Sequence, residues 1–295
     1  MDYLDKYGYA PDRGEIGRAI EMIAANMDNI ASDQVYKDCF SMMDLTTLKT
    51  DDTPASVAKL VEKVNAFHKS YPEWPLPASV CVFSNFAATV KEVRKEDFNI
   101  TVVSACFPSS QSFLEVKLKE VEMAVEQGAD EVDIVLALNA FLAGNYEVAA
   151  EEIRQVRRVI DEVAGKQGRN VHLKVILETG LLKTPENIAN ASFLAMEAGA
   201  DFIKTSTGKV DVNATPLAAY VMCECIDIYR MATGKKIGFK PAGGISSAAD
   251  ALCYYSIVSS LLGKDWLNKE LFRFGVSRVA NSLLSAVEQK TVSYF

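Results

Sequence analysis

The sequence is poor in the residues that metal-dependent and disulfide-stabilised proteins need. Its 295 residues include two histidines and six cysteines, and the cysteines show neither a CxxC metal spacing nor a dense disulfide pattern. A zinc-dependent enzyme brings several histidines to one point, whereas His68 and His172 both fall outside the expected strand ends. The sequence therefore predicts chemistry that uses no metal ion.

The chain also lacks a net positive charge and long apolar runs. The formal net charge is −8, so the overall field disfavours nucleic acid and anionic lipid. No apolar run approaches the length of a membrane span, and no basic stretch followed by an apolar one marks a signal peptide. These absences predict a cytoplasmic protein that binds neither nucleic acid nor membranes. An anionic ligand must then be held by local cations and backbone N–H groups.

Short apolar runs alternate with longer helical patterns along the chain. The predicted strands are residues 40–45, 79–83, 100–105, 131–136, 173–178, 202–205, 236–240 and 273–276, and the predicted helices between and after them are residues 56–69, 87–95, 114–127, 148–163, 185–198, 216–231, 248–262 and 281–289. This alternation predicts a parallel sheet, because parallel neighbours need a helical crossover.

An open, doubly wound sheet would give a similar local pattern, but three features favour a closed (β/α)8 TIM barrel. The strand count is eight, the length is near the ~250 residues typical of that fold, and no linker divides the chain. We expect one α/β barrel domain over residues 39–290. A helical extension over residues 1–38, with a helix near residues 15–29, precedes it, and a tail over residues 291–295 follows.

Two lysines and two aspartates fall at the carboxyl ends of predicted strands, namely Asp44, Asp133, Lys204 and Lys240. A single buried lysine would most simply form an ion pair. Two ammonium groups close together, however, disfavour each other's charged form, and the pKa of one then falls toward neutrality. A neutral lysine forms a Schiff base with carbonyls, and nearby carboxylates can move protons. The pattern predicts amine chemistry on an aldehyde or ketone and leaves open which lysine is the nucleophile.

Glycine-rich segments follow the last three predicted strands, at residues 205–209, 241–244 and 275–278. Barrel enzymes often hold phosphate in these loops, where glycine lets backbone N–H groups approach the anion. A Gly–Gly pair alone usually marks only a turn, but three such segments in adjoining loops favour a phosphate site. Its candidate residues are Thr207, Gly208, Lys209, Gly243, Gly244 and Ser277, and Arg278 could add a further donor.

Five segments closely resemble the 2-deoxyribose-5-phosphate aldolase family. They are DLTTL (44–48), GADEVDIV (128–135), KVILETG (174–180), GADFIKTSTGKVDVNAT (199–215) and GFKPAGGI (238–245). The resemblance implies a barrel enzyme of deoxyribonucleoside catabolism. That enzyme reversibly cleaves 2-deoxy-D-ribose 5-phosphate to D-glyceraldehyde 3-phosphate and acetaldehyde, without metal or cofactor. A homodimer is also expected, since barrel aldolases are often dimers.

The resemblance also assigns roles. It implies that Lys204 forms the Schiff base, that Lys240 lowers the pKa of Lys204, and that Asp133 exchanges protons through a water. Asp44 matches a further active-site carboxylate, and the phosphate-holding positions match Gly208, Lys209, Gly243, Gly244 and Ser277.

Several positions depart from the family pattern, two of them at the C-terminal end, and two other functions remain alternatives. Arg278 stands where relatives usually carry a small hydroxyl residue. Tyr294 is followed by Phe295, so the tail either folds back to the active site, as a C-terminal tyrosine can in the family, or is disordered. The alternatives are a transaldolase-like or keto-acid aldolase and a non-catalytic barrel that binds a phosphosugar.

Overall fold

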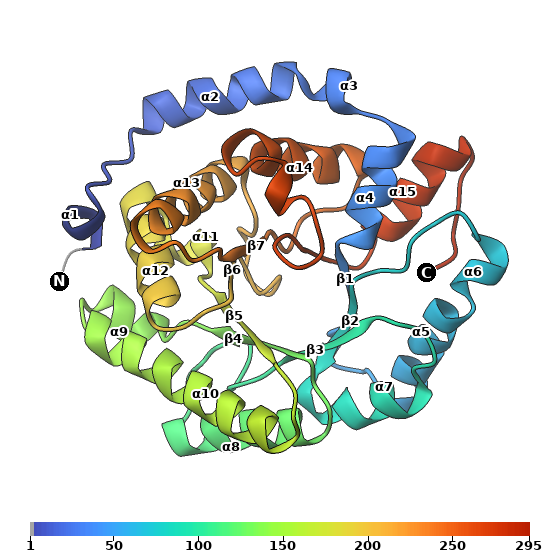
Figure 1. Cartoon of the computed structure of the whole chain (residues 1–295), viewed down its shortest axis with the longest axis horizontal. Coiled ribbons are helices and arrows are strands. Elements are labelled where there is room, and N and C mark those ends of the chain that lie inside the picture. Colours follow the sequence, from blue (N-terminus) through green and yellow to red (C-terminus); the bar gives the residue numbers. More distant parts are fainter. Residues whose placement is uncertain (1–2) are drawn as a thin grey trace.

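Eight parallel strands form a closed barrel in the computed structural model, which describes residues 3–295 (Figure 1). The strands are β1 (Met43–Thr46), β2 (Ser79–Phe83), β3 (Asn99–Val103), β4 (Glu131–Val135), β5 (His172–Ile176), β6 (Phe202–Lys204), β7 (Gly238–Lys240) and β8 (Phe274–Val276). Sequential strands are neighbours, and β8 pairs with β1. Parallel bridges from Phe239 to Phe272 and from Ala242 to Gly275 close the remaining side. The predicted (β/α)8 barrel is confirmed.

Helices surround the barrel and connect its strands (Figure 1). Within residues 3–295, four precede the first strand: α1 (Tyr3–Tyr7), α2 (Arg13–Ala25), α3 (Met27–Ile30) and α4 (Asp33–Ser41). The others are α5 (Pro54–Asn65), α6 (Phe67–Ser70), α7 (Ala87–Val93), α8 (Leu114–Glu126), α9 (Leu138–Leu142), α10 (Tyr146–Lys166), α11 (Thr179–Leu182), α12 (Pro185–Glu197), α13 (Pro216–Thr233), α14 (Ala248–Leu261) and α15 (Val279–Glu288), with short 3-10 turns at Ser84–Phe86 and Lys264–Trp266.

Helices α1, α2 and α3 pack against the outside of the barrel helices, whereas α4 lies between α14 and α15 (Figure 1). Helix α1 contacts α12, and α2 contacts α13 and α14, so this segment runs along one side of the ring (Figure 1). The helix expected near residues 15–29 is divided into α2 and α3. The division into an extension over residues 1–38, of which the first two lie outside the described range, a barrel and a tail stays a prediction.

Capping residues in the sequence define where several of the predicted helices begin. Thr53 and Ser56 form a capping box at the start of α5, and Ser247 and Asp250 form another at α14. The first predicted strand, residues 40–45, is partly wrong, because Phe40 belongs to α4. Its ring stacks on Phe67 at a centroid distance of 5.0 Å, and this burial stabilises the helix rather than a longer strand.

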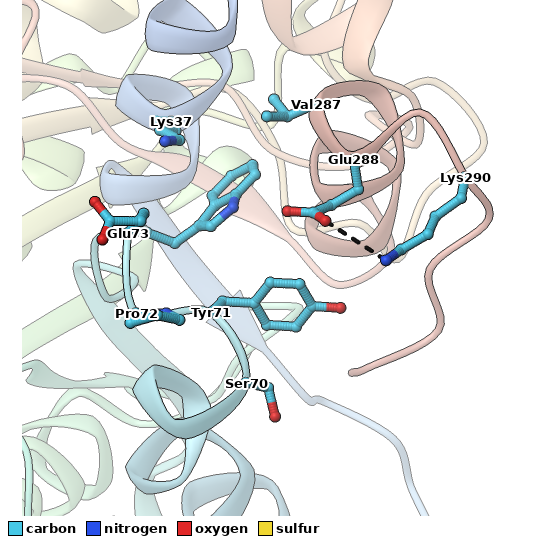
Figure 2. Close-up of a pocket in the computed structure, with 9 residues that line it drawn as sticks. Lys37, Ser70, Tyr71, Pro72, Glu73, Val287, Glu288 and Lys290 are labelled. Atoms are coloured by element: carbon cyan, nitrogen blue, oxygen red, sulfur yellow. Dashed lines mark ion pairs between the residues drawn. The ribbon is translucent and has the colours of Figure 1, made fainter.

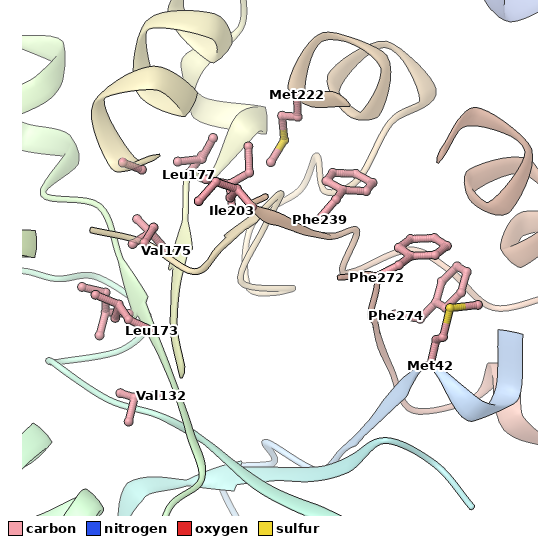
Figure 3. Packing of buried hydrophobic residues seen from close by; sticks show 14 of the residues in the cluster. Met42, Val132, Leu173, Val175, Leu177, Ile203, Met222, Phe239, Phe272 and Phe274 are labelled. Atoms are coloured by element: carbon pink, nitrogen blue, oxygen red, sulfur yellow. The ribbon is translucent and has the colours of Figure 1, made fainter. Parts of the chain in front are cut away.

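Side chains alternate between the two faces of each strand. The outward residues, such as Val132, Leu173, Val175, Ile203 and Phe239, pack under the helices in an apolar layer (Figure 3). The inward residues are charged at several positions, including Glu131, Asp133, Lys174, Lys204 and Lys240. Asp133 thus shares the inward face of β4 with Glu131, as alternation along the strand requires.

Residues 291–295 form no helix or strand, yet they are held against the barrel helices. Tyr294 Oη donates to the backbone oxygen of Lys63 at 2.8 Å, and Lys63 Nζ donates to the backbone oxygen of Tyr294 at 2.8 Å. The ring of Phe295 lies 5.5 Å from that of Phe67. A disordered tail is therefore the wrong alternative, and Tyr294 lies beside α6 instead of at the barrel mouth.

A cavity of about 400 Å³ lies on the outside of the barrel, between α15 and the segment around Tyr71 (Figure 2). Lys37, Trp74 and Glu288 contribute to its wall, and Glu288 forms an ion pair with Lys290 at 3.6 Å. None of the predicted site residues lines this cavity. Among the helices of residues 3–295, none combines the length and the apolar character needed to cross a membrane.

Candidate active site

Two lysines inside the barrel contact the same carboxylate oxygen. Lys204 Nζ donates to Asp133 Oδ2 at 2.8 Å, and Lys240 Nζ donates to the same atom at 2.7 Å. The arrangement follows from sheet register, because Lys204 and Lys240 are directly paired on β6 and β7. Asp44 also forms an ion pair with Lys240, so the structure brings together all four residues that the sequence predicts to carry the chemistry.

Further charged side chains lie around this group. Lys240 also pairs with Asp44, which accepts a hydrogen bond from Arg273 Nη1 at 2.6 Å. Arg273 Nη2 donates to Glu131 at 2.6 Å. Lys174 pairs with Glu131 and lies 3.2 Å from Asp133 Oδ1.

The charges in this network do not balance if every group is ionised. Three carboxylates (Asp44, Glu131 and Asp133) face four cations (Lys174, Lys204, Lys240 and Arg273), and the side chains are fully or almost fully buried. An uncompensated buried charge is costly. Loss of one proton from one lysine would make the network neutral, so the composition of the network favours one uncharged amine.

The pKa shifts indicate which lysine loses its proton. Burial lowers the pKa of Lys204; Asp133 acts against this, and the positive charge of Lys240 adds to the lowering. Burial also acts to lower the pKa of Lys240, but Asp133 and Asp44 outweigh it and raise that pKa. Asp133 has a lowered pKa, because Lys174, Lys204 and Lys240 overcome the effect of its burial. Of the two lysines that share Asp133, Lys204 is therefore the one that loses its proton more readily.

A cavity of about 290 Å³ opens at the carboxyl ends of the strands, and Lys204 forms part of its wall. Lys174 and Lys240 do not line it, and neither do Asp44 and Asp133, so within the ionic network Lys204 is the group presented to the cavity. All six candidate phosphate residues line it, namely Thr207, Gly208, Lys209, Gly243, Gly244 and Ser277, together with Arg278. The amine and the predicted phosphate loops thus share one cavity.

Glu178 holds the first of these loops in place. Its carboxylate accepts hydrogen bonds from the backbone N–H and the Oγ1 of Thr207, at 3.1 and 2.5 Å. Thr207 Oγ1 in turn accepts from the backbone N–H of Lys209 at 3.1 Å, and Lys209 Nζ donates to the backbone oxygen of Leu48 at 2.6 Å. This chain of contacts fixes the Lys209 loop across the cavity mouth.

Sequence reasoning missed the supporting role of four residues: Glu131, Lys174, Glu178 and Arg273. Each is a charged residue in or beside a predicted strand, and both faces of a barrel strand are buried. A charged residue on an inward face was therefore a usable signal, although it could not reveal the partner. Within residues 3–295, no group of three or more His, Cys, Asp or Glu side chains is arranged to hold a metal ion.

Comparison with known proteins identifies the family to which this chain belongs. Residues 39–253 match the DeoC/LacD family of aldolases, and the chain belongs to that family. It is an aldolase, a lyase that makes and breaks carbon–carbon bonds.

Individual relatives agree with this assignment. The human deoxyribose-phosphate aldolase is 42% identical over 261 residues, which cover 85% of this chain and 78% of the human one. A solved structure described as QR15, an aldolase, is 25% identical with a TM-score of 0.67, and the match covers 85% of this chain and 97% of that one. The fold is also similar to that of the tetrameric deoxyribose phosphate aldolase from Aeropyrum pernix, at 21% identity and a TM-score of 0.65, over 94% of this chain and 98% of that one.

Proposed function

We propose that this protein is a class I aldolase that reversibly cleaves 2-deoxy-D-ribose 5-phosphate to D-glyceraldehyde 3-phosphate and acetaldehyde. The observation that carries the proposal is that Lys204, the lysine with the lowered pKa, lines the same cavity as the phosphate loops. The name of the human relative supports the choice of substrate.

The reaction begins at the amine of Lys204. In its uncharged form it attacks the C1 aldehyde of the open-chain sugar, and loss of water leaves a protonated imine. This cation accepts the electron pair of the C2–C3 bond as the bond breaks and the C3 hydroxyl loses its proton. D-Glyceraldehyde 3-phosphate departs, and the remaining enamine takes a proton at C2. Hydrolysis then releases acetaldehyde and restores the Lys204 amine.

Asp133 is the proton acceptor in this scheme. Its lowered pKa keeps it ionised at neutral pH, so it stabilises the protonated imine directly. Through a water molecule it takes the proton of the C3 hydroxyl and returns it to the enamine. Lys240 lowers the pKa of Lys204, and Asp44 acts through Lys240 by holding that side chain charged and in position.

The phosphate of the substrate binds in the loops that line the same cavity as Lys204. Gly243 and Gly244 both have φ of +79°, a conformation that favours glycine and exposes backbone N–H groups to an anion. Lys209 and Ser277 supply a charged and a neutral donor. This anchor orients C1 toward Lys204, which is the main contribution that a binding site makes to a cleavage step.

Trapping of the imine tests the proposal. Borohydride added with acetaldehyde should modify Lys204 irreversibly, and peptide mass spectrometry locates the modified residue. Cleavage of 2-deoxy-D-ribose 5-phosphate should be lost in Lys204→Met and kept in Lys236→Met, whose side chain is 47% exposed on the surface. Modification at a lysine other than Lys204, or products other than the two named, would refute the assignment and favour another Schiff-base aldolase.

Further predictions from the sequence accompany this proposal. The enzyme needs no metal or other cofactor, so EDTA should leave the rate unchanged. It acts in deoxyribonucleoside catabolism, lies in the cytoplasm and forms a homodimer, for which light scattering of the purified protein is the direct test.

A further inference from the structure

A second cleft, of about 600 Å³, adjoins the catalytic cavity on the side of α5. The two spaces share five residues: Thr46, Thr47, Lys49, Ser277 and Arg278. Lys204 does not line the second cleft, whereas Lys59 and Lys63 of α5 line it and do not line the catalytic cavity. The cleft is therefore a neighbouring space with its own walls.

Positive charge is concentrated around this cleft. Lys49, Lys59, Lys63 and Arg278 come from three different segments and face one carboxylate, that of Asp52. The carboxylate is engaged by its own loop, because it accepts hydrogen bonds from Thr47 Oγ1 at 2.8 Å and from the backbone N–H of Lys49 at 2.9 Å.

The cations themselves lack acidic partners. Within residues 3–295, no carboxylate lies in ion-pair distance of Lys49, Lys59, Lys63 or Arg278. The whole chain carries a net charge of −8, so four cations without an acidic partner at one cleft form a local positive field against a negative background. Such a cleft attracts a multiply charged anion.

One wall of the cleft is apolar and fixed. Leu45, Leu60 and Phe295 line it. The backbone N–H of Phe295 donates to Asn281 Oδ1 at 3.0 Å, and its ring packs on Phe67. A held aromatic ring beside unpaired cations suits a ligand that carries both a flat ring and phosphate groups.

We propose that this cleft binds a nucleoside phosphate. The base packs against Phe295 and Leu60, and the phosphates contact Lys49, Lys59 and Arg278. The volume lies within the usual range of small-molecule sites, roughly 300–1,000 Å³. If the proposed aldolase function is correct, the shared Lys49 and Arg278 give a kinetic consequence. The bound nucleotide competes for them with the substrate phosphate, which raises KM and leaves kcat unchanged.

Calorimetric titration of the full chain with ADP tests the proposal, with adenosine and inorganic diphosphate as parallel probes. ADP should bind at least tenfold more tightly than either probe, because only ADP uses both the wall and the cations. Lys59→Glu should weaken ADP binding at least tenfold, since it reverses a charge that lines the cleft and not the catalytic cavity. The control is Lys119→Glu on α8, whose side chain is 60% exposed and whose ADP affinity should match that of the parent.

Three results would overturn the proposal: no binding of ADP, equal ADP affinity in the parent and Lys59→Glu, or diphosphate binding as tightly as ADP. The titration needs no turnover, so its outcome is separate from that of the cleavage assay. If the protein cleaves deoxyribose 5-phosphate but does not bind ADP, only the proposed nucleotide site is refuted. ADP binding in a protein that cleaves no deoxyribose phosphate refutes the proposed reaction alone.

Discussion

Replacement of Lys240 by methionine isolates the electrostatic part of the mechanism. Methionine has a similar length and no charge, so the change removes the cation that lies 2.7 Å from Asp133 Oδ2. Lys204 lies 2.8 Å from the same oxygen. It then loses the repulsion from Lys240, and Lys240 no longer competes with it for the Asp133 carboxylate. Both effects favour the protonated amine, so the pKa of Lys204 should rise.

The size of the effect follows from the geometry. Two amines that contact one oxygen lie about 5 Å apart, and at an effective dielectric constant of about 20 their repulsion is about 3 kcal/mol. Each 1.4 kcal/mol, approximately, changes a protonation equilibrium tenfold. The uncharged fraction of Lys204 at neutral pH should therefore fall on the order of 100-fold, and kcat should fall with it.

The assay is kcat for 2-deoxy-D-ribose 5-phosphate between pH 6 and pH 10. The loss in Lys240→Met should be about 100-fold at pH 7 and should shrink as pH rises, because alkali deprotonates Lys204 without help from Lys240. Lys236→Met serves as the matched surface control, and thermal unfolding checks that both variants are folded. A profile that lies parallel to that of the parent at every pH would refute the electrostatic account.

Three further predictions concern the ionic network and its packing. Arg273→Met strands two buried carboxylates and should lower the free energy of unfolding by about 3–5 kcal/mol, measured with denaturant, against about 1 kcal/mol or less for the exposed Arg158→Met; equal losses would contradict this. The pKa of Glu131 is lowered to about 2 although burial acts to raise it, because Lys174 and Arg273 stabilise the charged form. The contribution of ionised Glu131 to the free energy of unfolding is therefore complete above its pKa in the unfolded chain, about 4.3. It is lost as the pH falls through the pKa of Glu131 in the folded protein. Circular dichroism should show native structure at pH 4 and unfolding toward pH 2, and loss of structure already at pH 5 would be inconsistent with it. In Gly275→Ala the new Cβ would lie 2.7 Å from Ala242 Cβ and 3.1 Å from Lys240 Cε. Activity should then fall about tenfold or more, whereas Gly17→Ala, where nothing lies within 4 Å, should be neutral.

The sequence predicted the barrel well because its elements have distinct periodicities. The residue range of β2 was obtained in full, and the other strands differed from their predictions mainly at the ends. The clearest failure was Phe40, which belongs to α4. A short buried apolar run has the same appearance in a helix and in a strand, and contacts with distant residues such as Phe67 decide between them.

In the candidate site, too, the sequence predicted some features and not others. The positions of charged residues at the ends of predicted strands and the family motifs identified Lys204, Lys240, Asp133 and the phosphate loops. Neither indicated that Arg273, which directly precedes β8, would pair with Asp44 and Glu131. Residues so far apart along the chain become neighbours only when the barrel closes.

The amino-acid sequence alone determined which residues of a strand share a face, since alternation along a strand depends only on local geometry. It also determined the family, through motifs that surround the two lysines. Tertiary structure decided which lysine reaches the cavity, how four cations share three carboxylates, and where Tyr294 and Phe295 pack. These outcomes depend on distances between separate strands and helices, and such distances are set by closure of the barrel and by burial, which no local pattern contains.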